Sequence, residues 1–404
     1  MKQIIFHIDV NSAFLSWTAV EQLKNGADFD IREIPAIIGG DQQSRHGIVL
    51  AKSVSAKKFG IVTGEPVAHA LQKCPSIQMF PPNHKMYHEY SEKLMEFLRS
   101  YTPDIEQVSV DECYMDFTGI SYKYHSPVEA AFEIKDAIYE KFGFTVNIGI
   151  SVNRLLAKMA SDFEKPNKVH TLFPEEIPVK MWPLPVSELY MAGRSSVEVL
   201  HKLEIRTIGE LAKTDPKLLE LHLKSHGRTL WEFANGMGSS KVIREHVENK
   251  GIGNSTTLSK DATAEDEAKE VLLKLAETVG GRLRKEQQKA NMISVEIKYN
   301  TFQSVSHQKQ IGRATNADQM IYQTACELFH ELWNGQPIRL LGIRTSKLVS
   351  DDAPEQMSIF DFSYEESGGK VKDEKHQKLD KALDEIRKKF GDEAIKRGIF
   401  LKER

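Results

Sequence analysis

Residues 4–14 read IIFHIDVNSAF, an apolar run that contains one carboxylate and then takes on a helical composition. The segment from Ile4 to Val10 predicts a buried β-strand with Asp9 at its end. Apolar residues then recur at helical spacing over 13–24, and the Asn-Gly pair at 25–26 predicts the end of that helix. The chain therefore opens with a strand and a helix, and a carboxylate lies where the strand ends.

A second stretch, VSVDECYMDF at residues 108–117, predicts two short strands around a turn that contains two adjacent acids. Other apolar runs typical of strands alternate with amphipathic stretches as far as about residue 172. This mixture predicts one α/β unit. The expected strands are 34–38, 47–51, 105–110, 114–117 and 145–151, and the expected helices include 87–100 and 128–142.

Four prolines between residues 174 and 185 predict a domain boundary. Short helices interrupted by glycine are expected over 186–240, followed by a polar connector. The remainder predicts a second, smaller α/β domain and a charged terminal helix. Its expected elements are helices 266–288, 317–333 and 375–390 and strands 292–299 and 338–348.

Asp9, Asp111 and Glu112 are the candidate catalytic residues. Two adjacent acids in a tight turn and a third at the end of another strand suit a divalent metal, because hard cations such as Mg²⁺ bind carboxylate oxygens. Acids are also common at turns and helix starts. From spacing alone, Asp9 could equally cap a helix, and the other two acids could belong to a solvated hairpin turn.

The composition excludes several classes of protein. Of 404 residues, 40% are apolar and 27% are charged, which excludes a largely disordered chain. Three widely separated cysteines argue against a disulfide framework or a structural zinc site and favour a reducing cytoplasm. No apolar run reaches the ~18 residues of a membrane span. The net charge of −3 excludes a uniformly basic nucleic-acid binder, although basic residues outnumber acidic ones within 241–350.

Five motifs occur in one order along the chain, and together they carry a resemblance. They are DVNSAF at 9–14, AKKFGI at 56–61, SVDE at 109–112, GISVNRLLAKMAS at 149–161 and KPN at 165–167. The set resembles the Y-family translesion DNA polymerases, most closely the bacterial DNA polymerase IV group. Each motif alone is weak, but the combination is specific and the resemblance extends from residue 1 to about residue 350.

The resemblance implies a multi-domain α/β (α+β) fold, a right-hand polymerase with an added little finger. The implied palm comprises 1–10 and 81–172, and the fingers comprise 11–80. A small helical thumb with a helix-hairpin-helix would span 173–240, a linker 241–252, the little finger 253–349 and a tail 350–404.

The resemblance also implies a role for each candidate site residue. Asp9, Asp111 and Glu112 would hold two Mg²⁺ ions together with the carbonyl of Val10. Phe14 would be the steric gate that excludes ribonucleotides, although a core aromatic is the alternative interpretation. Two lysines would contact the dNTP triphosphate, or else would be solvated surface lysines: Lys57 and Lys165.

One departure from the family pattern concerns the triphosphate. Relatives usually have a tyrosine three residues before a phosphate-binding arginine, and here these positions hold Val54 and Lys57. Valine cannot hydrogen-bond a phosphate, and lysine replaces a two-pronged guanidinium with a point charge. Triphosphate binding is therefore expected to be weaker or differently arranged.

Contacts with primer–template DNA are expected in two regions. In the thumb, Gly193 and Arg194 lie in the turn of the expected hairpin, where backbone N–H groups would face a phosphate, although a plain helical turn remains the alternative. In the little finger, Lys298 and Arg344 lie on strands whose face could follow the DNA backbone.

The tail contains the sequence QMSIF at 356–360, which resembles the peptide that binds the bacterial sliding clamp. Gln356 and Ser358 precede the aliphatic–aromatic pair Ile359 and Phe360, and a short peptide with two apolar anchors suits docking into a groove. A chance hydrophobic segment is the alternative. No role follows for the terminal helix, and the single tail peptide fits a monomer.

The sequence thus predicts a cytoplasmic, low-processivity, error-prone DNA polymerase that extends primers across damaged template from dNTPs and releases pyrophosphate. Two alternatives stay open. A non-catalytic DNA-binding or clamp-binding relative would explain Val54 and Lys57, but not the three intact acids. A palm-domain nucleotide cyclase would have no use for the hairpin, the second α/β domain or the clamp peptide.

Overall fold

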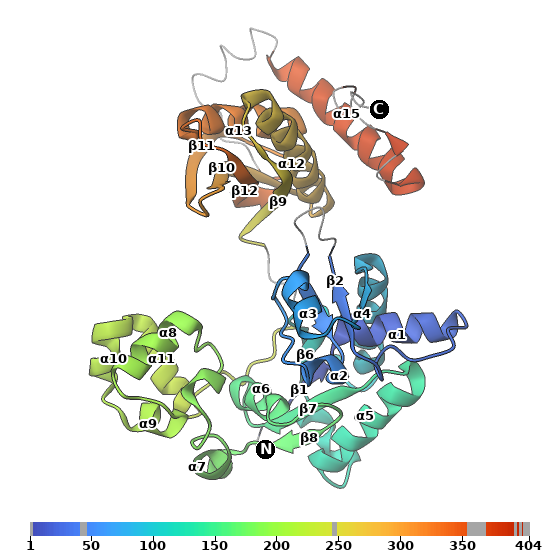
Figure 1. Ribbon diagram of the computed structural model, residues 1–404, viewed down its shortest axis with the longest axis vertical. Coiled ribbons are helices and arrows are strands. Elements are labelled where there is room, and N and C mark those ends of the chain that lie inside the picture. The colour runs from blue at the N-terminus through green and yellow to red at the C-terminus, as the bar shows by residue number, and fades with distance from the viewer. Residues whose placement is uncertain are drawn as a thin grey trace. The chain divides into compact units, whose positions relative to one another are not determined.

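The computed structural model describes residues 3–40, 47–244, 249–353, 369–391, 394–395 and 398. The chain divides into two compact units, one reaching residue 246 and the other beginning at residue 247. Figure 1 shows their elements, and each unit is described separately below.

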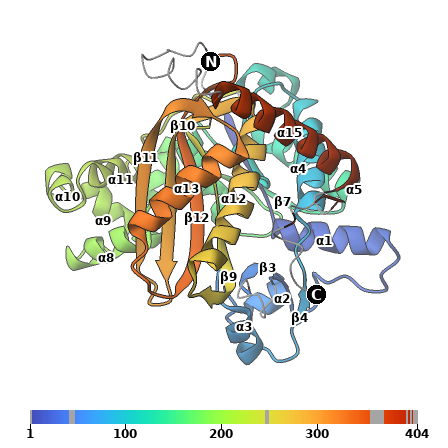
Figure 2. The same cartoon turned by 90° about the horizontal axis from the view of Figure 1, so that it is seen from above.

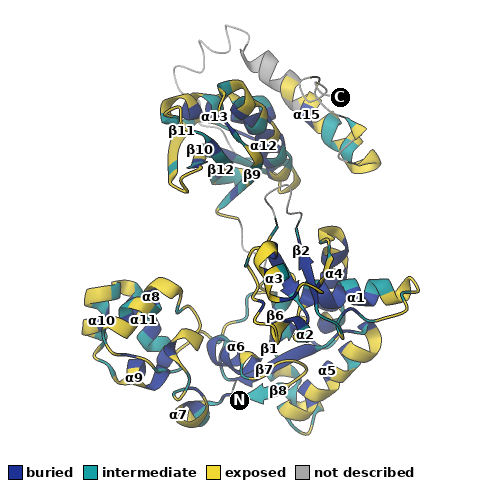
Figure 3. Ribbon diagram, viewed as in Figure 1, coloured by how far each residue is buried: buried dark blue, intermediate teal, exposed yellow. Residues whose placement is uncertain are grey.

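The first unit is built on a five-stranded sheet with the order β5-β6-β1-β7-β8. The central strand β1 is antiparallel to both β6 and β7, and β8 is parallel to β7. Each strand of the pair β1 and β7 is buried along almost its whole length (Figure 3). The bounds are β1 Ile5–Val10, β5 Ile105–Gln107, β6 Glu112–Asp116, β7 Val146–Ser151 and β8 Val169–Thr171.

Period-2 alternation sends the two sets of β1 side chains to opposite faces of this sheet. Phe6 and Ile8 face the main core, which they share with residues of three helices: α1 Ala13–Lys24, α4 His84–Arg99 and α5 Pro127–Phe142. The other face of β1 lies under α6, which spans Arg154–Asp162. Gly149 of β7 permits the close approach of α6, because a Cβ there would lie 2.0 Å from the Ala157 carbonyl oxygen.

A three-stranded sheet with the order β3-β2-β4 forms a second, smaller layer in the same unit. It packs with two short helices around its own apolar cluster, which includes Ile37, Val49 and Val67. The elements are β2 Ala36–Gly39, β3 Val49–Lys52, α2 Val54–Lys57, α3 Val67–Lys73 and β4 Gln78–Phe80.

The region after β8 is helical and encloses a third core, which includes Met181, Leu200 and Leu230. Its α-helices are α7 Ile177–Lys180, α8 Arg194–Lys202, α9 Ile208–Lys213, α10 Pro216–Leu223 and α11 Ser225–Ala234. The segment expected to be the first helix of a helix-hairpin-helix is only a 3-10 turn at Val186–Glu188. The backbone stops being helical at Leu189, which is extended, and Met191 then adopts a positive φ of 71°.

The second unit contains a four-stranded antiparallel sheet with the order β11-β10-β12-β9. Helices α12 and α13 lie side by side across one face of this sheet (Figure 2) and bury a core that includes Leu272, Val295 and Phe329. Helix α15 follows along the chain. The bounds are β9 Gly251–Ala262, α12 Glu265–Lys285, β10 Gln288–Tyr299, β11 Ser304–Thr315, α13 Asp318–Leu332, β12 Ile338–Ser350 and α15 Gly369–Phe390.

Candidate active site

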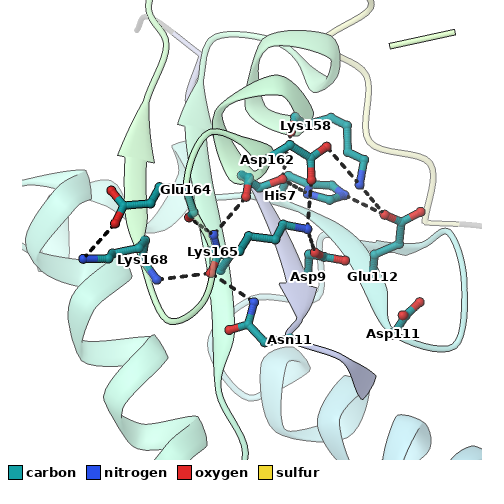
Figure 4. Close-up of polar contacts among 12 residues, drawn as sticks. His7, Asp9, Asn11, Asp111, Glu112, Lys158, Asp162, Glu164, Lys165 and Lys168 are labelled. Atoms are coloured by element: carbon teal, nitrogen blue, oxygen red, sulfur yellow. Dashed lines mark hydrogen bonds and ion pairs between the residues drawn. The ribbon is translucent and has the colours of Figure 1, made fainter. Parts of the chain in front are cut away.

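The fold brings the three candidate carboxylates to one place. Asp9 of β1 pairs directly with Glu112 of β6 in the antiparallel ladder, so both side chains are on the same face of the sheet. Asp111 precedes β6, and its carbonyl oxygen accepts a hydrogen bond of 3.0 Å from the backbone N–H of Val10. Residues a hundred positions apart in sequence thus meet at the end of β1 (Figure 4).

Two lysine ammonium groups lie against these acids. Nζ of Lys165 forms an ion pair with Asp9 and another, at 2.8 Å, with Asp162. Nζ of Lys158 lies 2.8 Å from Oε2 of Glu112. Figure 4 shows both lysines approaching the carboxylates from the side of α6 and the loop after it. Negative charge at the site is therefore partly neutralised by side chains of the chain itself.

His7 is the buried partner of Glu112. Its Nδ1 lies 2.8 Å from Oγ of Ser161, and its Nε2 lies 3.3 Å from Oε2 of Glu112. Burial lowers the pKa of His7, while the contact with Glu112 acts in the opposite direction. The contacts with His7 and Lys158 lower the pKa of Glu112 to about 2, so this carboxylate is ionised at neutral pH.

Asp111 has the opposite electrostatic environment. Burial raises its pKa, the charges of Asp9 and Glu112 raise it as well, and a 2.5 Å hydrogen bond from the Ser109 hydroxyl acts against them. Like charges held this close disfavour ionisation unless a cation is present. The oxygen donors and their mutual repulsion therefore fit a hard divalent cation.

In the part of the chain that the structure describes, no three His, Cys, Asp or Glu side chains are grouped closely enough to hold a metal ion. Carboxylate oxygens of Asp9 and Glu112 are instead paired with the ammonium groups of Lys165 and Lys158. A divalent cation at these acids would compete with the two ammonium groups.

Comparison with known proteins matches both units. Residues 8–162 match the impB/mucB/samB family and residues 249–359 match the impB/mucB/samB family C-terminal domain. The DNA polymerase IV of Clostridium acetobutylicum is 49% identical over 403 residues, which cover 100% of this chain and 99% of that protein. This chain belongs to the DNA polymerase IV group of the Y-family.

Two further comparisons agree with that assignment. The DNA polymerase IV 1 of Bacillus subtilis is 35% identical over 99% of this chain and 94% of its own. A solved Y-family DNA polymerase chimera of Dbh and Dpo4 has the same fold, with a TM-score of 0.75, 23% identity and coverage of 86% of this chain and 99% of that one. The expected family and fold class are confirmed.

In this Y-family chain, Phe14 lies on α1 and is partly exposed. Its ring stacks on Tyr87 of α4, with the centroids 4.3 Å apart, and meets His84 edge-on at 5.9 Å. The residue therefore packs against the core with one face and keeps part of its surface open, which is compatible with both interpretations of Phe14.

Lys57 and Val54 lie at the two ends of the four-residue helix α2, and both are exposed. Lys57 also acts on Lys52, whose pKa is lowered by burial and by this neighbouring positive charge. Two cations at this point of the smaller sheet provide an exposed positive site, and Val54 leaves an apolar surface beside it.

The predicted DNA contacts fall on two separate units. Gly193 is the N-cap of α8 and Arg194 its first residue, and both are exposed. Lys298 and Ser294 are four residues apart on β10, so their side chains lie on the same face of the sheet. Arg344 of β12 pairs with Ser294 and shares that face, which is the one opposite the helices. A groove over that face is lined by Ser294, Glu296 and Arg344, among others.

The predicted clamp-binding residues Gln356, Ser358, Ile359 and Phe360 lie outside the described residues. Among the helices that are described, none has the length and apolar character required to cross a membrane.

Sequence reasoning missed four contributors to the site, namely His7, Asn11, Asn147 and Lys158. His7 could have been found, since it lies two residues before Asp9 on a strand and its side chain therefore lies on the same face. Lys158 lies in the quoted motif at 149–161, and its position on a helix after β7 was a usable signal. Nothing in the sequence indicates that Asn11 and Asn147, which lie 136 positions apart, share a hydrogen bond.

Proposed function

We propose that this protein is a template-directed DNA polymerase that extends a primer from dNTPs, releases pyrophosphate and copies damaged template with low processivity and low fidelity. The observation that carries the proposal is the convergence of Asp9, Asp111 and Glu112 beside two lysines in a chain of the DNA polymerase IV group. For the palm, fingers, thumb and little finger we propose the same residue ranges that the family resemblance implies.

Two Mg²⁺ ions would be held by the carboxylates of Asp9, Asp111 and Glu112 and by the carbonyl of Val10. Ions held there would supply activation of the primer 3′-hydroxyl and neutralisation of the charge on the triphosphate and the departing pyrophosphate. The elevated pKa of Asp111 supports this assignment, since a cation between like charges removes the cause of that elevation.

The remaining residues bind and orient the nucleotide. Lys165 already holds an anionic oxygen of Asp9, and the same ammonium would pair with an oxygen of the dNTP triphosphate. Lys57 would supply a second positive charge, and the partly exposed ring of Phe14 would block a ribose 2′-hydroxyl. Glu112 would stay ionised throughout, because His7 and Lys158 hold its pKa low.

DNA and the sliding clamp are the proposed macromolecular partners. Backbone N–H groups at Gly193 and Arg194 would contact one phosphate, and Lys298 and Arg344 would follow the backbone without reading sequence. The peptide at 356–360 would tether a monomeric enzyme to the bacterial clamp and so compensate for its weak hold on DNA. A cytoplasmic location fits these partners.

Primer extension with Mg²⁺ and dNTPs on an undamaged template tests the proposal. Wild type should extend the primer, Asp111→Ala should abolish extension while retaining DNA binding, and the exposed acid variant Glu140→Ala should match wild type. Extension by Asp111→Ala would contradict the carboxylate site. DNA binding without extension by wild type would instead favour a relative that has lost its chemistry.

A further inference from the structure

Two buried amide side chains lie beneath the loop that carries Lys165. Asn11 follows β1 and is 7% exposed, and Asn147 lies on β7 and is fully buried. Nδ2 of Asn11 donates a hydrogen bond of 3.1 Å to Oδ1 of Asn147. Buried amides require partners for all their polar atoms, and these two find the rest of their partners in the loop and at the start of β7.

Asn147 holds three backbone groups of residues 161–168, a segment that comprises the last two residues of α6 and the loop that joins α6 to β8. Its Nδ2 donates to the carbonyl oxygens of Ser161 at 3.0 Å and Glu164 at 2.7 Å. Its Oδ1 also accepts a hydrogen bond of 3.2 Å from the backbone N–H of Lys168. One side chain thus fixes this loop both before and after Lys165.

Asn11 adds a fourth backbone contact to the same loop. Its Oδ1 accepts a hydrogen bond of 2.9 Å from the backbone N–H of Asn167 and another of 3.0 Å from the hydroxyl of Thr145. The loop is therefore anchored at Ser161, Glu164, Asn167 and Lys168, all through two side chains rooted in the central sheet.

The anchored loop carries one functional group toward the carboxylates. The ammonium of Lys165 reaches Asp9, which lies two positions before Asn11, and also bonds Asp162 at 2.8 Å. A lysine side chain is flexible, but its ammonium can reach only anions within one side-chain length of its backbone, so the position of the backbone decides which anions Lys165 can contact. The amide pair holds that backbone close to Asp9, because Asn147 of β7 pairs with Asp9 in the sheet and Asn11 follows the strand that carries Asp9.

We propose that Asn147, supported by Asn11, is a positioning residue that fixes the loop at 161–168 and thereby places the Lys165 ammonium for the dNTP triphosphate. This inference rests on the proposed function, in which Lys165 binds the triphosphate. Neither amide contacts the nucleotide, and both act through the backbone that carries Lys165.

The first test measures the loop without any catalysis. The full-length wild type, Asn147→Ala and Asn147→Thr are acetylated with an N-hydroxysuccinimide ester in metal-free buffer, and the rate at each lysine is read by mass spectrometry. The variants should label Lys165 about fivefold faster, since local opening of the loop separates its amine from Asp9 and Asp162, while the exposed Lys217 on helix α10 should be unchanged. An unchanged Lys165 rate in both folded variants would overturn the inference.

The second test is a double-mutant cycle on nucleotide binding. Asn147→Ala should raise the KM for dNTP about tenfold with a smaller effect on kcat, but should have almost no further effect in a Lys165→Ala background. An equal loss in both backgrounds would show a general structural role and overturn the inference. Asn147→Thr, which retains one polar oxygen on a β-branched side chain suited to a strand, serves the same cycle if Asn147→Ala does not fold.

Failure of the proposed function is distinguishable from failure of this inference. A wild type that does not extend primers would contradict the polymerase assignment, whereas the acetylation rates of Lys165 would still decide whether the amide pair holds the loop.

Discussion

The ring of Phe14 stacks on the ring of Tyr87, with centroids 4.3 Å apart and an interplanar angle of 7°. Tyr87 is buried in the core, so it fixes the orientation of a ring whose other side is partly open. Packing and selectivity are therefore not competing interpretations of Phe14, because the stack with Tyr87 would hold the ring rigid enough to exclude a 2′-hydroxyl.

Replacing Phe14 should relax sugar discrimination. Phe14→Ala removes the bulk that we place beside the sugar, and the ratio of kcat/KM for a ribonucleotide to that for the matching deoxyribonucleotide should rise by about tenfold or more. Single-nucleotide insertion kinetics measure this ratio. Tyr87→Leu is the matched control, since it loosens the ring without removing it and should have a smaller effect. Unchanged discrimination in Phe14→Ala would leave Phe14 as a core residue only.

Lys57 offers a test of the unusual triphosphate site. Lys57→Arg introduces a planar guanidinium that can bind a phosphate through two hydrogen bonds, so the KM for dNTP should fall severalfold while kcat changes little. Lys57→Ala should raise KM by about tenfold. Steady-state insertion assays check both, with Lys58→Ala as the neighbouring exposed control. If all three variants bind nucleotide equally well, Lys57 is a solvated surface lysine.

The tail peptide predicts stimulation by the sliding clamp. Gln356→Ala combined with Phe360→Ala should remove the gain in processivity that the clamp gives and leave extension without the clamp unchanged, because the tether acts only through local concentration. Glu355→Ala is the flanking control. Product length on a primed single-stranded template, with and without clamp, measures the effect. Equal stimulation of the double variant would place clamp binding elsewhere.

The strands nearest the site could be predicted because their signal is local. The run at 4–10 predicted a strand, and β1 spans Ile5–Val10, while the acid turn at 108–117 contains the start of β6. A short apolar run is ambiguous between helix and strand by periodicity alone, but the length of this one and its Ile and Phe residues favour a strand. The ladder that pairs Asp9 with Glu112 then follows from the family resemblance and not from spacing.

Two strands of the second unit could not be predicted from the sequence. β11, Ser304–Thr315, is mostly polar and lies at the edge of its sheet, where hydrogen bonds to β10 and not side-chain burial define it. β9, Gly251–Ala262, also lies at an edge, and it begins inside the stretch expected to be a connector. The Asn11–Asn147 bond was inaccessible for a similar reason, since only the assembled sheet brings those amides together.

A buried arginine connects α15 to the rest of the second unit. Arg284 at the end of α12 donates two hydrogen bonds to the carboxylate of Asp384 on α15, at 2.6 and 3.0 Å. It also donates one of 2.8 Å to Asp318 and one of 2.7 Å to the carbonyl oxygen of Asn316. Arg284→Met leaves these acceptors without their cation, which typically costs about 3 kcal/mol for a buried pair. We expect α15 to detach.

Hydrogen–deuterium exchange checks this expectation. Amides of α15 should lose protection in Arg284→Met, while those of β1 in the other unit should not change. Lys285→Met, a change at the next, exposed residue, is the matched control and should behave as wild type. Retained protection of α15 in Arg284→Met would show that its other contacts, such as that of Arg387 with Glu277, hold the helix instead.

The same cluster predicts a pH-dependent stability. Burial raises the pKa of Asp318 to about 7; the charge of Arg284 acts against this shift and that of Asp380 reinforces it. The pKa of Asp318 is 3.8 in the unfolded chain and about 7 in the folded state. Between these two pH values, Asp318 therefore keeps its proton in the folded state but has lost it in the unfolded chain. The free energy of unfolding should therefore fall as pH rises through this window and level off above it. Glu277 of α12 and two residues of α15, Asp384 and Arg387, are further charged groups at this contact between the helices.

Asp318→Asn isolates this contribution, because the amide does not titrate. Urea denaturation of both proteins at pH 5, 6, 7 and 8 should show wild type losing stability relative to Asp318→Asn as pH rises toward 7, with little further change above it. Asp266→Asn, which alters an acid in the first turn of α12, is the control and should follow wild type. Parallel pH dependences of wild type and Asp318→Asn would mean that Arg284 keeps Asp318 ionised in the folded state, so that the ion pair outweighs burial.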